Sequence, residues 1–336
     1  MKKTIALALL MLSASVFTRA QQRHVVVEEF TGTQCGWCVA GWVLLEHLRA
    51  ERPETCIPIS LHKYNLNDPM YLRAYPPADG VPSYPDWNFN RGPLAEPGVG
   101  EVGLQKALAA IDSIAAMPAE AWVSSLTATF TGEADNAVAL AATVDFRQEG
   151  DYEVAFVITA DSLQGTSALW RQSNYIAHWS IETAGAENDP ILAQFCEGER
   201  YGSDPTSIYY NDVAVATSYD NAALNLAPSL AHGLPKEPQT CQYTVALPQG
   251  TPLAAALRKD LLHAVALITD RSTGRIVNAL SVPVAGAPAG LADPVSQCAA
   301  SSAAYTLDGR PASARHSGLN IIATPDGVKK KTFRRQ

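Results

Sequence analysis

The chain has 336 residues, of which 47% are hydrophobic and 17% charged, with a formal net charge of −8. This length predicts two domains, each large enough to bury its own core. The acidic balance argues against nucleic acid or an anionic membrane surface as the main partner. No stretch of about 18 apolar residues predicts a transmembrane helix.

Residues 1–20 predict a secretory signal peptide. Lys2 and Lys3 precede an apolar run over residues 5–12, and Thr18-Arg19-Ala20 provides a cleavage region. Removal of this segment takes away three positive charges, so the net charge would fall from −8 to −11. An exported chain enters a compartment where disulfides form and persist, so its six cysteines would allow three pairs.

A dithiol motif comes directly after a predicted buried strand. The β-branched run at residues 25–27 predicts the strand, and residues 31–34 have turn chemistry. Cys35-Gly36-Trp37-Cys38 then begins an apolar helical pattern. Unpaired N–H groups and the dipole at a helix N-terminus favour a thiolate. We therefore assign Cys35 as the nucleophile and Cys38 as the resolving thiol.

Two other uses of these cysteines are less favourable. A structural disulfide with a two-residue spacer would close too small a loop to stabilise much of the fold. A zinc site would need a second Cys-x-x-Cys, which the sequence lacks, and His47 falls on the opposite helix face from Cys38. The residues therefore predict a redox site with no metal and no organic cofactor.

The rest of the first domain follows in a short series of elements. Residues 55–62 predict a second central strand, which begins at Cys56 and ends near His62. Cys56 is either a buried small hydrophobe or half of a second bridge, and His62 either a loop residue or an acid–base group. The remaining predictions are an insertion over residues 63–79, a strand over 86–90 and a helix over 101–115. Met117-Pro118 ends this helix and places the domain boundary at residue 118.

The residues around the dithiol resemble the thioredoxin superfamily. Glu29 lies six residues before Cys35, where thioredoxin-like proteins carry a buried acidic residue that relays the resolving cysteine's proton. Gly80-Val81-Pro82-Ser83 is similar to the cis-proline loop that faces the dithiol and pairs with an extended substrate. The resemblance implies catalytic roles for Glu29 and Pro82. It implies substrate contacts for Gly36, Trp37 and Val81.

Longer stretches narrow the resemblance. EEFTGTQCGWC, PISLHKYNLNDPMYL and GVPSYPDWNFNR resemble Bacteroidetes outer-membrane-protein-related proteins, in which a thioredoxin-like domain precedes a β-rich domain. The resemblance covers about residues 22–285. The chain differs from standard thioredoxin in having Glu29 for Asp, Gln34 for Trp and Trp37 for Pro.

After residue 120 the hydrophobic residues alternate with polar ones, as in β-strands, which predicts an all-β domain over residues 119–285. Alternating strands are expected at residues 122–131, 137–147, 151–160, 239–247, 262–270 and 276–284. This number of strands predicts an antiparallel, immunoglobulin-like sandwich. The predicted fold class is therefore an α/β thioredoxin-like domain followed by a β-sandwich domain.

The long connection at residues 161–212 is rich in tryptophan and tyrosine. These aromatic residues either cap the open edges of the sandwich or contact a client protein or glycan. Cys196 falls in this connection and Cys241 on the strand after it, so a Cys196–Cys241 bridge is the favoured pair. Cys56 and Cys298 are the two cysteines that remain once the other four are assigned to pairs.

The C-terminal part predicts a linker and a tail. Residues 286–304 are rich in Ala, Gly, Pro and Ser, which is typical of a linker. Residues 305–336 end in a basic cluster. The tail resembles the closing segment of Bacteroidetes cell-surface or secreted proteins that a dedicated export machinery recognises, and a solvated basic tail is the alternative.

These features predict an exported thiol–disulfide oxidoreductase of the periplasm, outer membrane or cell surface. Its partners would be client proteins with thiols or disulfides, together with a redox partner protein. The competing prediction is a surface or outer-membrane-associated binding or structural protein that has a thioredoxin fold and little catalytic activity.

Overall fold

The computed structural model describes residues 22–76, 81–93, 98, 100–219 and 229–286, and the strands at 304–305, 318–323 and 329–334. Its contacts divide the chain into two units, residues 1–294 and 295–336. The predicted signal peptide, Gly80, Cys298 and most of the predicted linker lie outside the described residues.

The first unit begins with a parallel β-α-β arrangement. Strand β1 (Val25–Thr31) leads into helix α2 (Cys38–Glu51), and β2 (Cys56–His62) returns parallel to β1. All seven β1 residues are buried, as expected for a central strand with both faces covered. Strand β3 (Asp86–Phe89) pairs antiparallel with the other side of β1, and helix α3 (Gly100–Ala115) follows.

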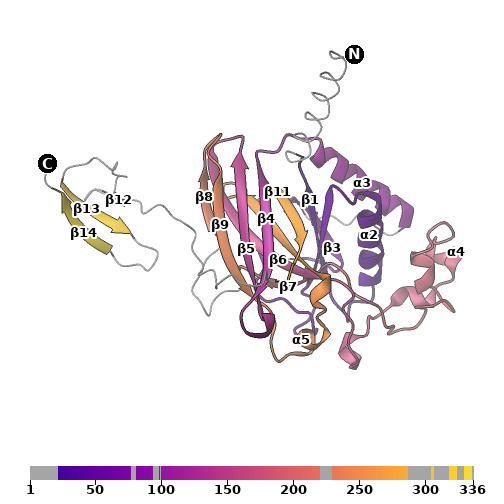
Figure 1. The fold of residues 1–336 in the computed structure, drawn as a ribbon. Helices are drawn as coiled ribbons and strands as arrows, with labels where there is room; N and C mark the ends of the chain where they lie inside the picture. Colours follow the sequence, from indigo (N-terminus) through magenta and orange to yellow (C-terminus); the bar gives the residue numbers. More distant parts are fainter. Residues whose placement is uncertain are drawn as a thin grey trace, which may run out of the picture. The chain divides into compact units, whose positions relative to one another are not determined.

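Alternation along β1 directs its side chains into two cores. Val25 and Val27 pack under α2 and α3, which lie side by side on one face of the sheet (Figure 1). The buried partners on that face are Leu44, Leu45, Leu48, Cys56, Trp87, Ala107, Leu108 and Ile111. Val26 and Phe30 point to the opposite face.

The sheet continues without interruption into the second half of the unit. Its strand order is β11-β10-β6-β7-β2-β1-β3, with β8 also paired to β6. The added strands are β6 (Gly150–Ala160), β7 (Val213–Thr217), β8 (Ser229–Gly233), β10 (Leu262–Asp270) and β11 (Ile276–Pro283). The joint is the parallel pairing of β2 with β7 at Ser60 and Val213.

This shared sheet differs from the predicted separation into two domains at residue 118. Residues from both sides of that boundary form one core, which is composed of Val26, Phe30, Ile57, Ile59, Leu61, Leu72, Tyr75, Val157, Ala214, Val265, Leu267, Ile276 and Ala279. Strand β7, which the sequence analysis did not predict, connects the two halves. Its five residues are all buried.

A smaller antiparallel sheet packs on part of the large one. It has the order β4-β5-β9, formed by β4 (Ala121–Thr131), β5 (Ala137–Phe146) and β9 (Gln239–Ala246). Phe156 of β6 stacks on Tyr243 of β9, with ring centroids 6.1 Å apart. The predicted antiparallel strands therefore exist, but one of the two layers belongs to the mixed sheet that carries the dithiol.

The connections contain short helices. Residues 161–212 include α4 (Ile181–Ala184) and single turns at Ala168–Trp170, Tyr175–His178 and Leu192–Phe195. Helix α5 (Pro252–Ala256) lies between β9 and β10, and further turns occur at Glu133–Asp135 and Lys259–Leu261. The second unit is a three-stranded antiparallel sheet of β12 (Ala304–Tyr305), β13 (Gly318–Ala323) and β14 (Lys329–Arg334).

Candidate functional site

Cys35 and Cys38 form a disulfide between the end of β1 and the start of α2. Their Cα atoms are 5.3 Å apart. The Cys35 N–H donates to Gly32 O and the Cys38 N–H to Cys35 O, both at 3.1 Å. Two consecutive turns therefore lead from the strand into the helix, whose N-cap residue is Trp37. The disulfide occupies the position that the sequence predicts.

Both cysteines are almost completely buried. Cys38 is 1% exposed and Cys35, the assigned nucleophile, is 4% exposed. Cys35 is buried because another part of the chain covers the disulfide loop.

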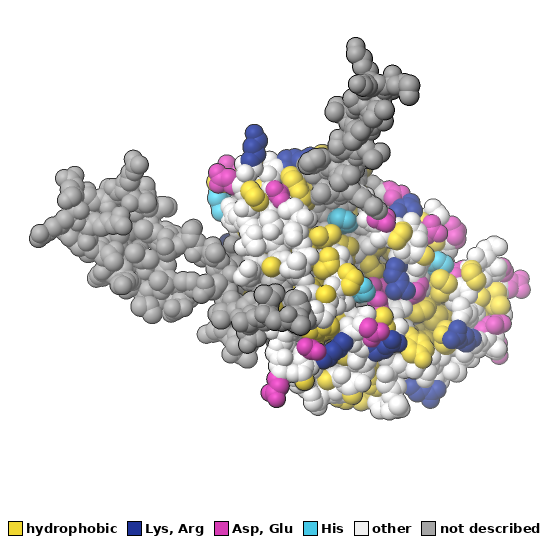
Figure 2. All heavy atoms as spheres, viewed as in Figure 1, with side chains coloured by type: hydrophobic (Ala, Val, Ile, Leu, Met, Phe, Trp, Pro, Cys, Tyr) yellow, Lys and Arg dark blue, Asp and Glu magenta, His cyan; other side chains and the backbone are white. Residues whose placement is uncertain are grey.

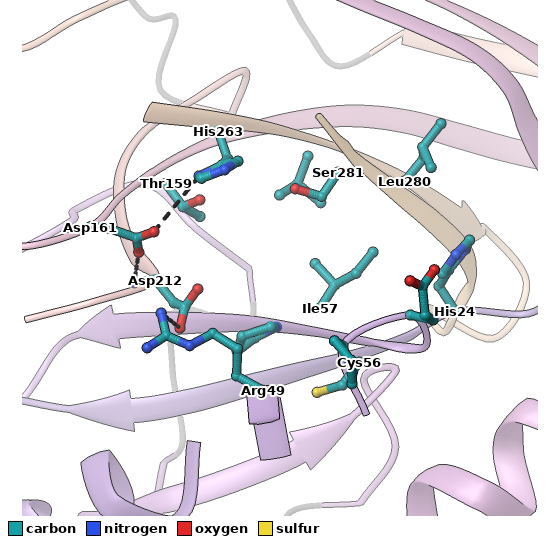
Figure 3. A pocket seen from close by; sticks show the side chains of 14 residues that line it. His24, Arg49, Cys56, Ile57, Thr159, Asp161, Asp212, His263, Leu280 and Ser281 are labelled. Atoms are coloured by element: carbon teal, nitrogen blue, oxygen red, sulfur yellow. Dashed lines mark hydrogen bonds and ion pairs between the residues drawn. The ribbon is translucent and has the colours of Figure 1, made fainter. Parts of the chain in front are cut away.

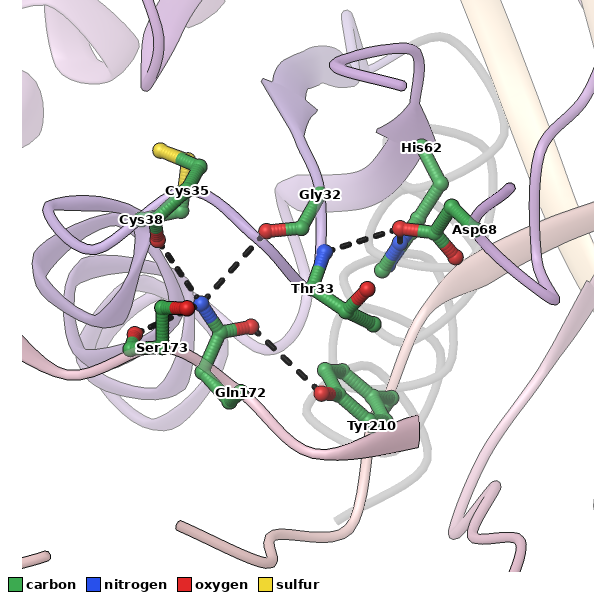
Figure 4. Close-up of a disulfide and its surroundings, with 9 residues drawn as sticks. All are labelled: Gly32, Thr33, Cys35, Cys38, His62, Asp68, Gln172, Ser173 and Tyr210. Atoms are coloured by element: carbon green, nitrogen blue, oxygen red, sulfur yellow. Dashed lines mark hydrogen bonds and ion pairs between the residues drawn. A yellow bond between two sulfur atoms is a disulfide. The ribbon is translucent and has the colours of Figure 1, made fainter. Parts of the chain in front are cut away.

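The cover is the segment of residues 172–179, from the long connection at 161–212. The Ser173 N–H donates to Thr33 O at 2.7 Å, and the Tyr175 N–H donates to Gly36 O at 3.1 Å. The side chain of Gln172 donates through Nε2 to Cys35 O at 2.8 Å (Figure 4). The cover segment therefore pairs with the backbone of the disulfide loop itself.

Aromatic side chains complete the cover. The ring of Trp37 contacts Tyr175 edge to face at 5.7 Å and Trp179 at 5.3 Å. Tyr175 lies so close over Gly36 that a Cβ atom at residue 36 would collide with its ring. Trp37 and Tyr175 remain 42% and 47% exposed. Hydrophobic side chains also gather near α4 in the same connection (Figure 2). At these positions the aromatic residues cover the dithiol rather than the edges of a sandwich.

Glu29 lies on β1, on the face that α2 covers. Ser60 Oγ of β2 donates to Glu29 Oε2 at 3.0 Å, whereas Oε1 is buried without a hydrogen-bond partner among the described residues. Burial raises the pKa of Glu29 to about 7, against the opposing effects of Ser60 and His62. Gly41 of α2 makes room for the carboxyl group, because a Cβ atom there would collide with Oε1.

A small cavity joins Glu29 to the dithiol. Its lining includes Cys38, Glu29, Ser60 and His62, together with Gln172 and Tyr210 from the 161–212 connection. The cavity volume is about 10 Å³, which is the space that one water molecule needs. Glu29 and Cys38 therefore line the same small cavity.

His62 ends β2 beside this cavity. Its Nδ1 lies 2.8 Å from Asp68 Oδ2, and the same oxygen accepts the Thr33 N–H at 2.8 Å. The ring of Tyr210 contacts His62 edge to face at 5.5 Å. His62 is thus a buried residue at the end of β2 and not a loop residue, and Asp68 connects it to the disulfide loop.

No protein-family model matches this chain, and no curated protein matches it. Its structure is similar to HBP35 of Porphyromonas gingivalis. The two share 14% sequence identity and a TM-score of 0.51, over 93% of this chain and 98% of the other. At this identity the likeness establishes the fold alone. The chain therefore has a thioredoxin-like fold that carries the Cys35–Cys38 disulfide.

Two weaker likenesses carry no argument about fold or function. One is a protein of Agrobacterium tumefaciens, with a TM-score of 0.39, 14% identity and coverage of 82% of this chain and 100% of the other. The other is a domain of the outer membrane lipoprotein Omp28 from Porphyromonas gingivalis. Its TM-score is 0.25 at 9% identity, over 51% of this chain and 92% of the other.

The cis-proline position in this HBP35-like fold is not the predicted one. The cis peptide before β3 joins Tyr84 to Pro85, and the Val81–Pro82 bond is not among the cis bonds of the described residues. Pro82 is exposed and Val81 packs against the core of the large sheet. Pro85 lies beside Gly41 of α2. The sequence predicted the cis bond at Pro82, whereas the cis bond of this stretch precedes Pro85, directly before β3.

The predicted Cys196–Cys241 bridge is not formed. Cys196 is a free thiol at the end of the turn Leu192–Phe195, and its Sγ lies 3.8 Å from Leu192 O. That turn packs toward α2, where Phe195 contacts Trp42, whereas Cys241 belongs to β9 of the small sheet. Cys56 is also a free buried thiol, so its interpretation as a small hydrophobe is confirmed.

A second, larger cavity lies along β2 and is lined by Cys56, Ile57 and Pro58 of that strand. Its volume is about 480 Å³, and its polar lining includes Arg49, Asp161, Asp212 and His263. Figure 3 shows Asp161 between His263 and Asp212. Burial, and then the nearby Asp161, raise the pKa of Asp212 to about 8. Asp212 also accepts the Ser60 N–H through its backbone oxygen at 2.8 Å, and Ser60 lines the small cavity beside Cys38.

Within the described parts of the chain, no group of three or more His, Cys, Asp or Glu side chains is arranged to hold a metal ion. The helices described there include none that is long and apolar enough to cross a membrane.

Sequence reasoning missed four residues of the site: Gln172, Tyr175, Tyr210 and Pro85. The aromatic richness of residues 161–212 was a signal, but it did not show where that connection lies. Gln172 and Cys35 are 137 positions apart, and no local pattern brings them together.

Proposed function

We propose that this chain is a thiol–disulfide oxidoreductase that acts on protein cysteines through Cys35 and Cys38. The observation that carries the proposal is Glu29. A disulfide that only braces a fold needs no carboxyl group beside it, and an unpaired carboxyl oxygen is costly to bury. A carboxyl group with a pKa near 7 beside a cysteine is suited to proton transfer.

The reaction would proceed through a mixed disulfide. A client thiolate attacks Cys35 Sγ and breaks the Cys35–Cys38 bond, and Cys38 leaves as a thiolate that takes a proton from Glu29. A second client thiolate then attacks the client sulfur and releases Cys35. The client loses two electrons and the chain gains them. The reverse sequence reduces a client disulfide, with Cys38 as the resolving thiol.

Client access requires the cover segment to move. At 4% exposure, Cys35 offers little surface to an attacking thiolate. Two backbone hydrogen bonds, the Gln172 side chain and the aromatic contacts of Trp37 join the cover to the disulfide loop, and these are the contacts that a local opening would break. The partners in this proposal are client proteins with thiols or disulfides and a redox partner protein, in an exported location that residues 1–20 support.

A binding or structural role is the second candidate, and the burial of both sulfurs favours it. Insulin reduction and the refolding of a reduced, disulfide-containing protein distinguish the two. We expect activity in the wild type and in Cys196→Ser, a matched change of a buried cysteine outside the site, and its loss in Cys35→Ser. Cys38→Ser should retain a client as a mixed disulfide on Cys35. Equal rates for wild type and Cys35→Ser would support the binding role instead.

A further inference from the structure

Two residues with unpaired buried atoms line the cavity beside Cys38. Glu29 Oε1 and His62 Nε2 each lack a hydrogen-bond partner among the described residues. Buried polar atoms without partners are rare in native proteins, and a buried water molecule is a common explanation. The cavity has room for one water, and Glu29 and His62 are both polar residues of its lining.

The orientation of His62 is set by Asp68. Burial raises the pKa of Asp68, but His62 and the N–H groups of Thr33 and Met70 have the larger combined effect and lower it below its usual value. Asp68 is therefore a carboxylate and accepts hydrogen bonds only. Nδ1 of His62, 2.8 Å away, therefore donates to this carboxylate, and Nε2 is the ring nitrogen left for a further partner.

We propose that His62 is a second proton acceptor for Cys38, connected to Glu29 by one water molecule in this cavity. The inference rests on the proposed oxidoreductase function. When Cys38 attacks a mixed disulfide on Cys35, its thiol proton passes to Glu29 and through the water to His62 Nε2. The Cys35–Cys38 bond forms, the client thiolate leaves, and His62 holds the proton as an imidazolium paired with Asp68. In the reverse step the proton returns to the Cys38 thiolate.

The surroundings of His62 leave few other acceptors. The titratable groups that face it are Asp68 from the segment after β2, Glu29 from β1, Cys38 from α2 and Tyr210 from the cover side. Tyr210 Oη donates its proton to Trp170 O at 3.0 Å, and Asp68 already accepts from two backbone N–H groups. Glu29 Oε1 and His62 Nε2 are therefore the atoms among these groups that have no hydrogen-bond partner.

The test uses the full reduced protein and 5,5′-dithiobis(2-nitrobenzoate) as the oxidant. Cys35 releases one thionitrobenzoate in a first phase, and the attack of Cys38 on the resulting mixed disulfide releases a second. Only the second phase requires Cys38 to lose its proton, and Cys38→Ser gives the baseline without it. The rates are measured from pH 5.5 to 9.

Two variants separate proton transfer from positioning. His62→Asn keeps an amide donor near the Nδ1 position, within reach of Asp68, and removes Nε2. His62→Gln places an amide near the Nε2 position and loses the Asp68 bond. Neither side chain titrates. We expect the second phase of His62→Asn to be at least about tenfold slower than in wild type at pH 7 and to approach the wild-type rate near pH 9, where hydroxide replaces the relay.

Each outcome decides the inference. A wild-type pH profile in His62→Asn would overturn it, and so would a rate reduced by the same factor at every pH, which indicates positioning alone. If His62→Asn does not fold, the pH profile of His62→Gln decides by the same criterion. A wild type that shows neither phase contradicts the proposed function and the relay together. Both phases in wild type with an unchanged profile in the variant contradict the relay alone.

Discussion

Burial raises the pKa of Glu29 to about 7, so its carboxyl group changes charge in the pH range where a thiol–disulfide exchange enzyme would work. The same shift affects stability. In the unfolded chain a glutamate ionises near its usual pKa of about 4.3. Between that pH and 7 the folded state binds a proton that the unfolded state has lost, so stability falls as the pH rises.

Glu29→Gln should remove this pH dependence. We expect the wild type to lose about 3 kcal/mol of unfolding free energy between pH 4.5 and pH 8 through this group, and the variant not to lose it. The variant should therefore be the more stable protein at pH 8 and similar to wild type at pH 4.5. Urea denaturation at several pH values measures the difference, with Glu51→Gln at the exposed end of α2 as control. A variant less stable than wild type at pH 8 would contradict the shifted pKa.

Gly41 makes room in α2 for the Glu29 carboxyl group. Alanine in a helix interior is ordinarily more favourable than glycine by about 1 kcal/mol. At this position a Cβ atom would collide with Glu29 Oε1 and lie 3.1 Å from Pro85 Cβ. Gly41→Ala should therefore lower the unfolding free energy by about 1–3 kcal/mol, as overpacking does. The control is Ala50→Gly, at an exposed position of the same helix, which should lower the unfolding free energy by about 1 kcal/mol through helix propensity alone. A higher unfolding free energy for Gly41→Ala would contradict the predicted collision.

At the scale of elements, the cover segment limits access to the dithiol. Tyr175 closes over Gly36, and its contact with Trp37 is worth about 0.5–1.5 kcal/mol. If opening of the cover precedes reaction, loss of that contact increases the open population by about twofold to tenfold. Tyr175→Ala should accelerate the reduction of the disulfide by dithiothreitol by this factor. Trp37 fluorescence in a stopped-flow experiment would follow the reaction.

The control for this prediction is Tyr209→Ala, another exposed tyrosine of the same connection, whose backbone oxygen accepts from Trp42. Its rate should equal that of wild type. Gly36→Ala should act like Tyr175→Ala, because the added methyl group would displace the ring. Unchanged rates in both cover variants would mean that reagents reach Cys35 by another route.

At the scale of the molecule, the shared sheet makes the two predicted domains depend on one another. Strand β7 completes the sheet beside β2, and the core on that face draws residues from both halves. A protein of residues 22–294 should therefore unfold in a single transition, with coincident curves from tryptophan fluorescence and circular dichroism. A fragment of residues 22–118 should lack a cooperative transition, since Ile57, Ile59 and Leu61 lose their partners. Two separate transitions would restore the two-domain description.

Much of the first half followed from local patterns in the sequence. The β-branched run of β1, the turn after it and the Cys-x-x-Cys at a helix start specify one another over a few residues, so the disulfide and Cys38 within a helix were predictable. The spacing of apolar residues also predicted a helix at residues 101–115, and the structure has it at Gly100–Ala115. Period-2 alternation also located β4, β5, β6, β9, β10 and β11 to within one or two residues.

The sequence by itself thus determined the dithiol, the strand before it and the helix that follows, because backbone propensity and side-chain period act over short distances. Only the tertiary structure decided that β7 joins the sheet and that residues 172–179 cover the cysteines. These features depend on hydrogen bonds and packing between segments more than a hundred positions apart, such as Gln172 with Cys35 and Ser60 with Val213. Such contacts are selected by the whole core, and no window of the sequence contains both partners.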